Sequence, residues 1–429
     1  MESIRIREIP EHLGEPIELH GWLYNKRSSG KIQFLLVRDG SGIVQSVVKA
    51  DNEAAFQTAE ELTQESSIIV RGRAKADERA PTGYELSIDG LELVHEAEDY
   101  PITPKEHGTG FLMDHRHLWL RSSKQMPVIR IRHEVMRAIR EYFDRAGFIA
   151  TESPILTSTS VEGTTSLFEV DYFDDTAYLS QSGQLYLEAT AMALGDVYWI
   201  GPTFRAERSK TRKHLTEFWM AEAEMAFCDH EGNLRYQEEL IRYVIERVLE
   251  RCAPELETLE RDTTQLERAI MEPFARATYD ESIEILNSEG HQIDWGDDYG
   301  APDEEALADH FGKPVFIEKF PAKMKAFYME PDPSNSDVVM AADLLAPEGY
   351  GEIIGGSQRI DDKDLLIRKL NEFGLPRAPY EWYIDLRRYG SVPHSGFGMG
   401  VERLVAWMAG VEHLRECIPF PRMLYRLTP

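Results

Sequence analysis

The residues best suited to chemistry lie in 201–227, which reads as a strand, a basic loop and a returning strand. Because side chains alternate faces along a strand, Arg205 and Glu207 point the same way, and Phe218 stands on the returning strand. A guanidinium can bind phosphate, a carboxylate can accept from an exocyclic amine, and a ring can stack on a base. The alternative is a solvated hairpin with an ordinary Arg/Glu pair. Cations crowd the loop, which favours an anionic ligand: Arg208, Lys210, Arg212, Lys213 and His214.

Two carboxylates flank a turn in DLLAPEGYGE. In simple register Asp343 lies directly opposite Glu352, and such a pair repels unless a cation lies between them. Mg²⁺ is the natural cation because it binds through one or two carboxylates plus substrate phosphates. Gly355-Gly356 could form a bulge that turns Arg359 towards the same cavity. A surface acidic hairpin is the alternative, but the apolar neighbours indicate a buried strand pair.

Two further segments carry weaker signals. Glycines at 396, 398 and 400 lead into a helix, and Arg403 lies in its first turn, which suits an anion at the helix N-terminus. A helix from Gln184 places Gln184, Leu187 and Glu188 on one side, where the polar pair could line a pocket or face solvent. Glu162 lies in the polar loop before that helix.

Composition excludes several classes of protein. The 429 residues carry 47 Lys and Arg against 75 Asp and Glu, a net charge of −28, which opposes general binding to polyanions. Any contact with nucleic acid must use local basic islands. The three cysteines are widely spaced, without the pattern of a zinc site or a disulfide framework, which fits a reducing cytoplasm. No apolar run has the length that a bilayer requires, so we expect no membrane association.

Residues 1–98 predict a small closed barrel of the OB kind, because short β-rich runs alternate with turn signals and one helical stretch. Arg27 belongs to a basic island around Phe34, whose ring could stack on an unpaired base, and Gln45 could read a base edge. The alternative for a lone Phe in a strand is an ordinary core position. The module is therefore a candidate binder of single-stranded RNA.

The remaining chain is expected to form a hinge, 99–124, and a large domain, 125–429, with an acidic helical segment around 255–312. A helix from Pro127 should end at Gly147, and the strand that follows contains Pro154, which favours an edge or an interface. A long helix beside an edge strand could make a dimer surface, or it could simply pack within one chain. Ala277–Gly312 has no Lys or Arg and is expected to face away from RNA.

These segments together resemble the class II aminoacyl-tRNA synthetases of the aspartate/asparagine/lysine subgroup, and within it the asparaginyl enzymes. The resemblance covers essentially the whole chain and rests on three signatures: the helix and strand ending at Pro154, FRAE with its HLTEF loop, and GFGMGVER. It implies an α+β protein with an OB-fold anticodon-binding domain and a catalytic domain built on an antiparallel sheet flanked by helices. Ser395 departs from the family, whose members usually have glycine there.

The resemblance implies ATP-dependent activation of L-asparagine, release of pyrophosphate, and transfer to tRNA(Asn) by a cytoplasmic homodimer. Arg205 would bind the α-phosphate, Glu207 the adenine amine and Arg403 the γ-phosphate, and Phe218 would stack on adenine. Asp343 and Glu352 would hold Mg²⁺. The other implied contacts are His214 and Glu352 for ATP, Glu162 and Gln184 for the ammonium group and backbone of the amino acid, and Arg27, Phe34 and Gln45 for the anticodon.

The identity of the amino acid depends on a few positions. Similar aspartyl enzymes carry a Lys where this chain has Leu187, and losing that cation should disfavour aspartate. Arg359 can donate to a side-chain carbonyl, whereas Glu188 can accept from an amide and would repel a carboxylate. Three alternatives remain: a non-discriminating aspartyl enzyme, an amide-forming relative, and an inactive RNA-binding paralogue. The barrel argues against the second, and the intact charged residues argue against the third.

Overall fold

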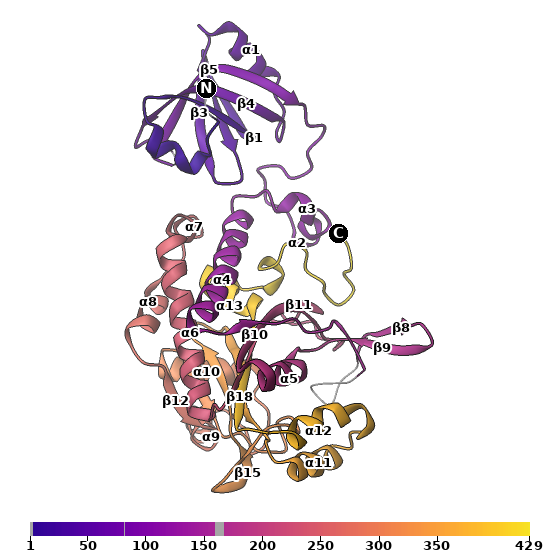
Figure 1. The fold of residues 1–429 in the computed structure, drawn as a ribbon. Helices are drawn as coiled ribbons and strands as arrows, with labels where there is room; N and C mark the ends of the chain where they lie inside the picture. Colours follow the sequence, from indigo (N-terminus) through magenta and orange to yellow (C-terminus); the bar gives the residue numbers. More distant parts are fainter. Residues whose placement is uncertain (1–2, 81, 159–166) are drawn as a thin grey trace. The chain divides into compact units, whose positions relative to one another are not determined.

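The computed structural model describes residues 3–80, 82–158 and 167–429. The chain forms two compact units, Met1–Gly108 and Thr109–Pro429, each described by itself. The short helices α2 and α3 of the second unit lie within the predicted hinge segment 99–124 (Figure 1).

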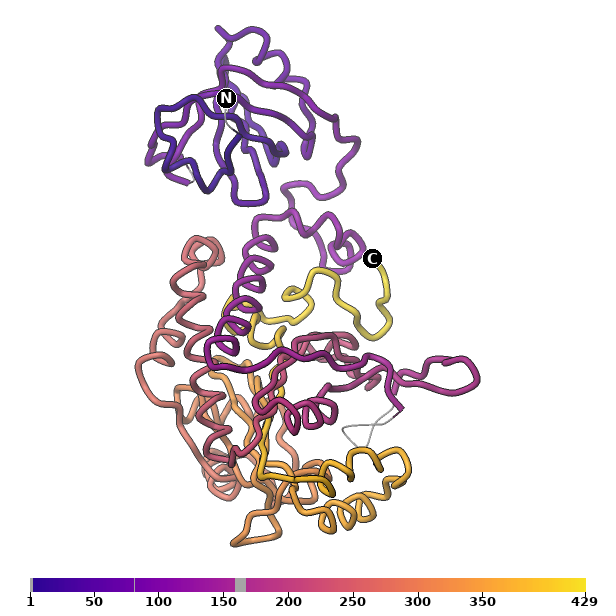
Figure 2. The backbone as a smooth tube through the Cα atoms, viewed as in Figure 1, coloured from indigo at the N-terminus to yellow at the C-terminus, as the bar shows by residue number. Residues whose placement is uncertain are grey.

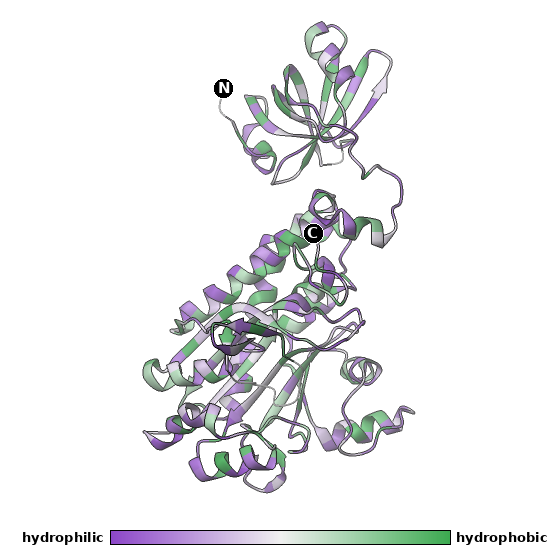
Figure 3. Cartoon of the chain, turned by 90° about the vertical axis from the view of Figure 1, so that its right-hand side faces the viewer, coloured by the Kyte–Doolittle hydropathy of each residue, from purple (hydrophilic) through white to green (hydrophobic). Residues whose placement is uncertain are grey.

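The first unit is a closed five-stranded barrel with strand order β1-β2-β3-β5-β4, in which β3 and β5 are parallel and the other pairs antiparallel. Figure 3 shows hydrophobic and hydrophilic residues alternating along these strands, as expected when one face lines a core. The predicted OB fold is therefore confirmed. Its elements are η1 Ile6–His12, β1 Pro16–Ser29, β2 Ile32–Arg38, β3 Ile43–Lys49, α1 Glu53–Glu61, β4 Ser67–Ala76 and β5 Tyr84–His95.

The second unit is organised by an eight-stranded sheet of order β12-β13-β16-β17-β18-β11-β10-β6. Its inner strands are antiparallel, as expected, and its two outermost pairs, β12 with β13 and β10 with β6, are parallel. The strands are β6 Ile149–Ala150, β10 Asp196–Phe204, β11 Glu217–Ala226, β12 Ala275–Thr278, β13 Val315–Glu318, β16 Ala341–Ala346, β17 Gly351–Arg359 and β18 His394–Gly400.

Helices flank the sheet, and two small sheets accompany it (Figure 1). The small sheets comprise β7 Leu156–Thr157, β8 Glu169–Tyr172 and β9 Asp175–Leu179, and β14 Pro331–Asp332 with β15 Asn335–Val339. The helices are α2 Thr109–Asp114, α3 Arg116–Trp119, α4 Gln125–Ala146, α5 Gln184–Leu194, α6 His230–Arg251, α7 Ala253–Thr258, α8 Thr264–Met271, α9 Tyr279–Ser288, α10 Ala301–Phe311, α11 Lys363–Glu372, α12 Glu381–Arg388 and α13 Val401–Ala409, with short η2 Ala378–Tyr380 and η3 Leu414–Glu416.

The main core lies where α4, α6 and α13 cover the sheet. Helix α4 buries residues at helical spacing, among them Ile131, Val135 and Ile139, and ends at Gly147 in the left-handed conformation, as its sequence predicts. Ala221, Ala223 and Met225 of β11 face this core. The alternate residues of β11, including two glutamates, consequently face the opposite side, where they can form a polar site.

The C-terminal segment returns to the start of the second unit, as Figure 2 shows for the yellow and purple parts of the chain. Arg116 donates to the carbonyls of Pro419 and Ile418, and Arg422 accepts a backbone hydrogen bond from Thr216. The segment therefore ties the loop between β10 and β11 to α3.

Two local predictions in the second unit are wrong. Asp343 pairs with Gly355, and Glu352 pairs with Leu345, because the extra residue of the bulge is Ile353 and not Gly355-Gly356. The glycine-rich segment leads into a helix, α13, with Arg403 in its first turn as predicted, but the segment itself is the central strand β18 and not a glycine-rich turn. In both cases pairing with neighbouring strands overrode the local glycine signal.

No helix in the described part of the chain is long and apolar enough to cross a membrane.

Candidate active site

A cavity opens at the ends of β10 and β11. The backbone N–H of Arg205 donates to Thr216, so pairing continues past the strands and holds Arg205 and Phe218 at the cavity wall. The guanidinium carbon of Arg205 lies 5.4 Å from the centroid of the Phe218 ring. All the predicted ATP-binding residues line this cavity: Arg205, Glu207, His214, Phe218, Glu352 and Arg403.

Two of these residues are tuned by their surroundings. Burial lowers the pKa of His214, and Arg403 and Arg205 lower it further, so the imidazole is neutral at pH 7. The guanidinium of Arg403 donates to the carbonyl of Glu352 at 2.5 Å and lies 3.5 Å from its carboxylate. Because the His214 ring is neutral, the positive charge of the cavity is carried by its arginine and lysine side chains, among which Arg403 is held in place by Glu352.

The carboxylates of Asp343 and Glu352 converge although their backbones are not paired. A Cβ on Gly355 would lie 3.1 Å from Glu352 Oε1 and 3.5 Å from Asp343 Oδ1, so the absent side chain leaves room for both. Lys325 Nζ lies 2.5 Å from Asp343 Oδ2, a cation that sequence reasoning missed. Burial raises the pKa of Asp343 to about 6, and Glu352 adds to this while Lys325 opposes it.

The donor set fits Mg²⁺ when phosphates complete it. The described residues contain no group of three or more His, Cys, Asp or Glu side chains suited to a metal ion. A pair of carboxylates aimed at one space nevertheless matches the usual mode of Mg²⁺ binding, in which substrate phosphates and waters supply the remaining ligands. Arg205 and Arg403, which line the nucleotide cavity together with Glu352, suit those phosphates.

A second cavity continues from the first, since both are lined by Arg205, Met220, Glu352 and Gly398. It brings together Gln184, Asp343 and Arg359, as the sequence predicts, and adds Glu222, whose carboxylate accepts from the backbone of Gly183 at 2.7 Å. The two cavities therefore share part of their wall and form one continuous space with polar residues at both ends.

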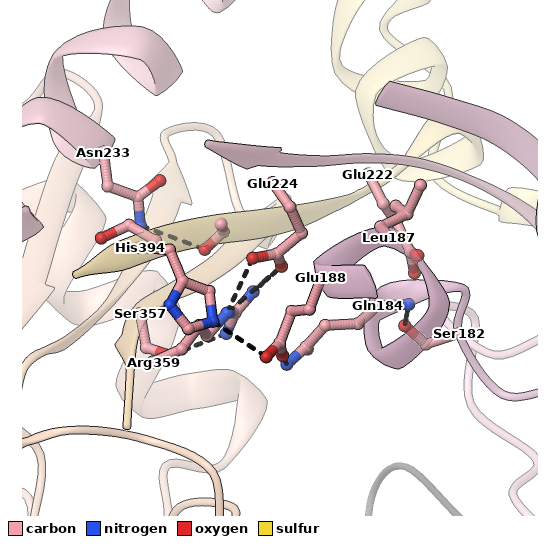
Figure 4. A network of polar contacts seen from close by, with 12 residues as sticks. Ser182, Gln184, Leu187, Glu188, Glu222, Glu224, Asn233, Ser357, Arg359 and His394 are labelled. Carbon is pink, nitrogen blue, oxygen red and sulfur yellow. Dashed lines mark hydrogen bonds and ion pairs between the residues drawn. The ribbon is translucent and has the colours of Figure 1, made fainter. Parts of the chain in front are cut away.

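Arg359 is held by Glu224 (Figure 4). Its Nη2 lies 2.5 Å and its Nε 3.2 Å from Glu224 Oε1, and its Nη1 donates to Ser357 at 2.7 Å. A Cβ on Gly396 would lie 2.0 Å from the same carboxylate oxygen, so glycine in β18 makes this contact possible. Burial and Glu188 raise the pKa of Glu224 to about 7, against the effect of Arg359.

Glu188 does not line the cavity. It is fully buried, and its two oxygens accept from Gln184, Tyr383 and Arg387, with His394 at 3.0 Å. Its acceptor capacity is therefore occupied by the protein. Leu187 packs with Ala191, Val197 and Trp199, also away from the cavity. Glu162 lies outside the described residues.

The period-two pattern of β11 could have identified Glu224, because it shares a strand face with Glu222. The partner that makes Glu224 informative, Arg359, lies 135 residues away, and only tertiary structure joins them. Ser395, the departure from the family pattern, is buried and donates to the carbonyl of Cys228 at 2.8 Å.

The barrel carries a second candidate site. Arg27 and Phe34 are cross-strand partners, and the guanidinium carbon lies 4.3 Å from the ring centroid. Arg27 also donates to Gln45 at 3.5 Å, while the amide of Gln45 donates to Glu85 at 3.0 Å. The ring is half-buried and lies outside the core cluster of the barrel. The structure thus brings together the three residues predicted to contact an anticodon.

Known proteins share this architecture. Residues 109–424 match the family model of class II tRNA synthetases (D, K and N), and residues 17–94 match an OB-fold nucleic acid binding domain. The chain is 58% identical to the asparagine–tRNA ligase of Pelotomaculum thermopropionicum, covering 100% of both. It superimposes on asparaginyl-tRNA synthetase from Pyrococcus horikoshii complexed with asparaginyl-adenylate with a TM-score of 0.95 and 46% identity, covering 100% of both.

An aspartyl-tRNA synthetase from Entamoeba histolytica is also similar, with a TM-score of 0.86 and 26% identity over 100% of this chain and 93% of that one. The fold is thus shared across the group, while sequence identity is much higher to the asparaginyl enzymes. The chain belongs to the class II tRNA synthetases (D, K and N), in the family of the asparagine–tRNA ligases.

Proposed function

We propose that this protein ligates L-asparagine to tRNA(Asn) in two steps. The carboxylate of asparagine attacks the α-phosphorus of ATP in line and pyrophosphate leaves; a terminal hydroxyl of tRNA then attacks the adenylate and AMP leaves. The observation that carries this proposal is the continuous polar space between the nucleotide-binding residues around Arg205 and the Arg359–Glu224 pair. The chain needs no covalent intermediate for either step.

The nucleotide end of the cavity supplies positioning and positive charge. Phe218 stacks on adenine, Glu207 accepts from its amine, and Arg205 binds the α-phosphate on which charge develops as the carboxylate attacks. Arg403 and His214 bind the remaining phosphates, Arg403 at the γ position. Preorganised cations are the main means by which such a site stabilises the transition state, since no general base is required.

Mg²⁺ would be held by Asp343 and Glu352, and it would neutralise the leaving pyrophosphate. Lys325 and Arg403 brace these carboxylates in the protein, at 2.5 Å and 3.5 Å respectively, and so fix the direction in which they face the phosphates.

At the other end, Gln184 binds the ammonium group of the amino acid, as does Glu162. Arg359 donates to the side-chain carbonyl of asparagine. Glu224 takes the acceptor role first assigned to Glu188, because the donors on Glu188 are buried, whereas Glu224 is paired with Arg359, a residue that lines the cavity. A carboxylate at this place would repel aspartate, and a buried acceptor left unpaired rejects the wrong isostere by about 10⁴ to 10⁵.

The barrel would bind the anticodon of tRNA(Asn). Phe34 offers a face for stacking, Arg27 supplies a cation beside it, and Gln45 has an amide whose orientation is fixed by Glu85.

We also propose a cytoplasmic homodimer. Three apolar residues in β6 or shortly after it in the chain are between 41% and 45% exposed, namely Ile149, Ile155 and Leu156, and an edge strand with exposed apolar residues suits a second copy. Analytical ultracentrifugation should give twice the mass of one chain, and Ile149→Asp should shift the protein towards monomer; a fully active monomer would contradict this. All three cysteines are buried thiols, which fits a reducing compartment.

The decisive experiment is ATP–pyrophosphate exchange with purified protein and Mg²⁺, run in parallel with asparagine and with aspartate. Exchange with asparagine alone is expected. Exchange with aspartate would move the function to a non-discriminating or amide-forming enzyme, and exchange with neither would indicate an inactive RNA-binding relative.

A further inference from the structure

We propose that Glu304, from the acidic helix α10, is a positioning residue that holds Lys213 at the wall of the nucleotide cavity. The inference deepens the proposed function and rests on it. It also gives a task to part of the acidic segment, whose sequence suggests only a surface facing away from RNA.

Lys213 lines the nucleotide cavity, and Glu304 does not. Lys213 belongs to the loop between β10 and β11 and lines the cavity with Arg205 and Arg403, whereas Glu304 stands behind it and does not line the cavity. Their charged atoms are 3.7 Å apart, and the side chains are 25% and 19% exposed. The carboxylate therefore anchors the lysine from outside the space that the nucleotide would fill.

Glycine in the neighbouring hairpin makes this contact possible. Gly351 has φ +70°, and a Cβ there would lie 2.0 Å from Glu304 Oε2 and 2.9 Å from Lys213 Nζ. Both charged groups thus lie directly against the backbone of residue 351, beside Glu352. The adjacent Glu305 lies instead against Gly349, at 3.4 Å from the position of a Cβ, and is exposed.

Glu304 lies among several charged groups. Burial raises the pKa of Glu304 and Glu352 raises it further, while Lys213 and Arg403 oppose the shift. A lysine ammonium is a compact charge on a flexible stem, so an ion pair with Glu304 at 3.7 Å restricts where it lies and leaves its donor hydrogens for phosphate oxygens. Ordering the side chain before ATP arrives reduces the entropy lost on binding.

Another ion pair of the same loop provides a contrast. Arg212 pairs with Glu412 at 2.6 Å, but the two side chains are 70% and 80% exposed, and neither lines the nucleotide cavity. Such an exposed pair contributes little and cannot position a ligand contact. Glu412→Gln, which removes the partner of Arg212, is therefore a control for an ion pair made by the same loop, and Glu305→Gln is a control within the helix.

The test is ATP binding by isothermal titration calorimetry on the full-length chain, which requires no choice of amino acid. Lys213→Met should weaken ATP binding about tenfold to a hundredfold, because it removes a charged hydrogen bond. Glu304→Gln, which nearly keeps the shape, should weaken it about threefold to tenfold, while Glu305→Gln and Glu412→Gln should change it less than about twofold. Unchanged binding in Glu304→Gln overturns the proposal.

A double variant separates positioning from a general loss of structure. If Glu304 acts through Lys213, Glu304→Gln should have no further effect on ATP binding in the Lys213→Met background. A loss that persists there overturns the proposal. Should Glu304→Gln fail to fold by thermal melting, Glu304→Asp, which withdraws the charge from Lys213, should show the same direction of change.

ATP–pyrophosphate exchange by the wild-type protein distinguishes a failure of the proposed function from a failure of the inference about Glu304. Absence of asparagine-dependent exchange would refute the proposed function, and equal ATP affinity in wild type and Glu304→Gln would refute only this inference.

Discussion

Arg205 lies where the two cavities of the active site meet, since it lines both. Its backbone is fixed by a hydrogen bond to Thr216, and its guanidinium lies beside Phe218. In the function we propose, a cation at this junction would lie next to the α-phosphate of a nucleotide that fills one cavity while an amino acid fills the other. Single residues of this kind act on the developing charge of the transition state and contribute little to the fold.

Arg205→Ala should lower asparagine-dependent ATP–pyrophosphate exchange by about 10² to 10³ because it removes one preorganised donor. Its thermal midpoint and circular dichroism spectrum should match those of wild type. Arg208→Ala is the matched control, because Arg208 is exposed and outside the cavity lining. An exchange rate within twofold of wild type would remove Arg205 from the proposed role.

At the scale of elements, β18 shows how one strand shapes the site on the next. Gly396 leaves space for the carboxylate of Glu224, and Gly398 leaves space for Met220, whose Cε would lie 2.6 Å from a Cβ. Both glycines pair with β11, opposite Glu224 and Glu222. The glycine-rich signature is thus explained by side chains of the neighbouring strand crossing over its backbone.

Gly396→Ala should destabilise the fold by about 1–3 kcal/mol and displace Glu224 from Arg359, because the new methyl group overlaps a buried charged group. Exchange with asparagine should fall with the unfolding free energy, which a urea titration measures. Gly398→Ala should cost less stability, since its obstacle is the flexible tip of Met220. Equal losses in both variants would show that the overlap with Glu224 has no special effect.

A second inter-element contact predicts a pH dependence. Glu318 of β13 is buried, which raises its pKa, but hydrogen bonds from His230 of α6 and Arg276 of β12 lower it to about 2, below the ordinary 4.5. A carboxylate with a depressed folded-state pKa stabilises the fold above pH 4.5, and this contribution is lost as the pH falls towards 2.

Glu318→Gln should therefore lower the free energy of unfolding at pH 7 by on the order of 2 kcal/mol, allowing for screening of a partly solvated network. The difference between variant and wild type should shrink as the pH is lowered from 4.5 towards 2. Denaturant titrations of both proteins at several pH values measure it. A difference that does not change with pH would mean that packing, and not charge, explains the loss.

At the scale of the whole molecule, the two units carry different candidate sites. Each has its own hydrophobic core, and the candidate residues for RNA and for adenylate chemistry lie on different units. A change in the barrel should consequently affect the transfer of asparagine to tRNA and leave its activation unchanged.

Phe34→Ala should weaken tRNA charging, seen as a higher KM for tRNA, by an amount equivalent to about 1–3 kcal/mol for one stacked base. ATP–pyrophosphate exchange should remain at the wild-type rate. Leu93→Ala, an exposed apolar position on β5 of the same barrel, is the control and should affect neither step. Equal loss of both activities in Phe34→Ala would contradict a role confined to RNA.

The sequence alone determined much of this protein. Alternation of apolar residues and turn signals predicted the barrel, and the helical spacing before Gly147 predicted α4, because local patterns fix which face of an element is buried. The signatures around Arg205, Asp343 and Arg403 predicted a nucleotide site, since residues that bind phosphates and metals have few chemical substitutes.

Tertiary structure decided what lies between distant elements. Glu188 and Glu224 are both buried glutamates beside apolar residues, but three donors on α12 and β18 occupy the first, whereas the second pairs with Arg359 of β17, which itself lines the cavity. Lys325 likewise meets its partner, Asp343 of β16, only in the folded chain. The same holds for Glu304, whose partner Lys213 lies in the loop between β10 and β11. Hydrogen bonds reach about 3 Å, so their partners depend on atomic positions that no local sequence pattern encodes.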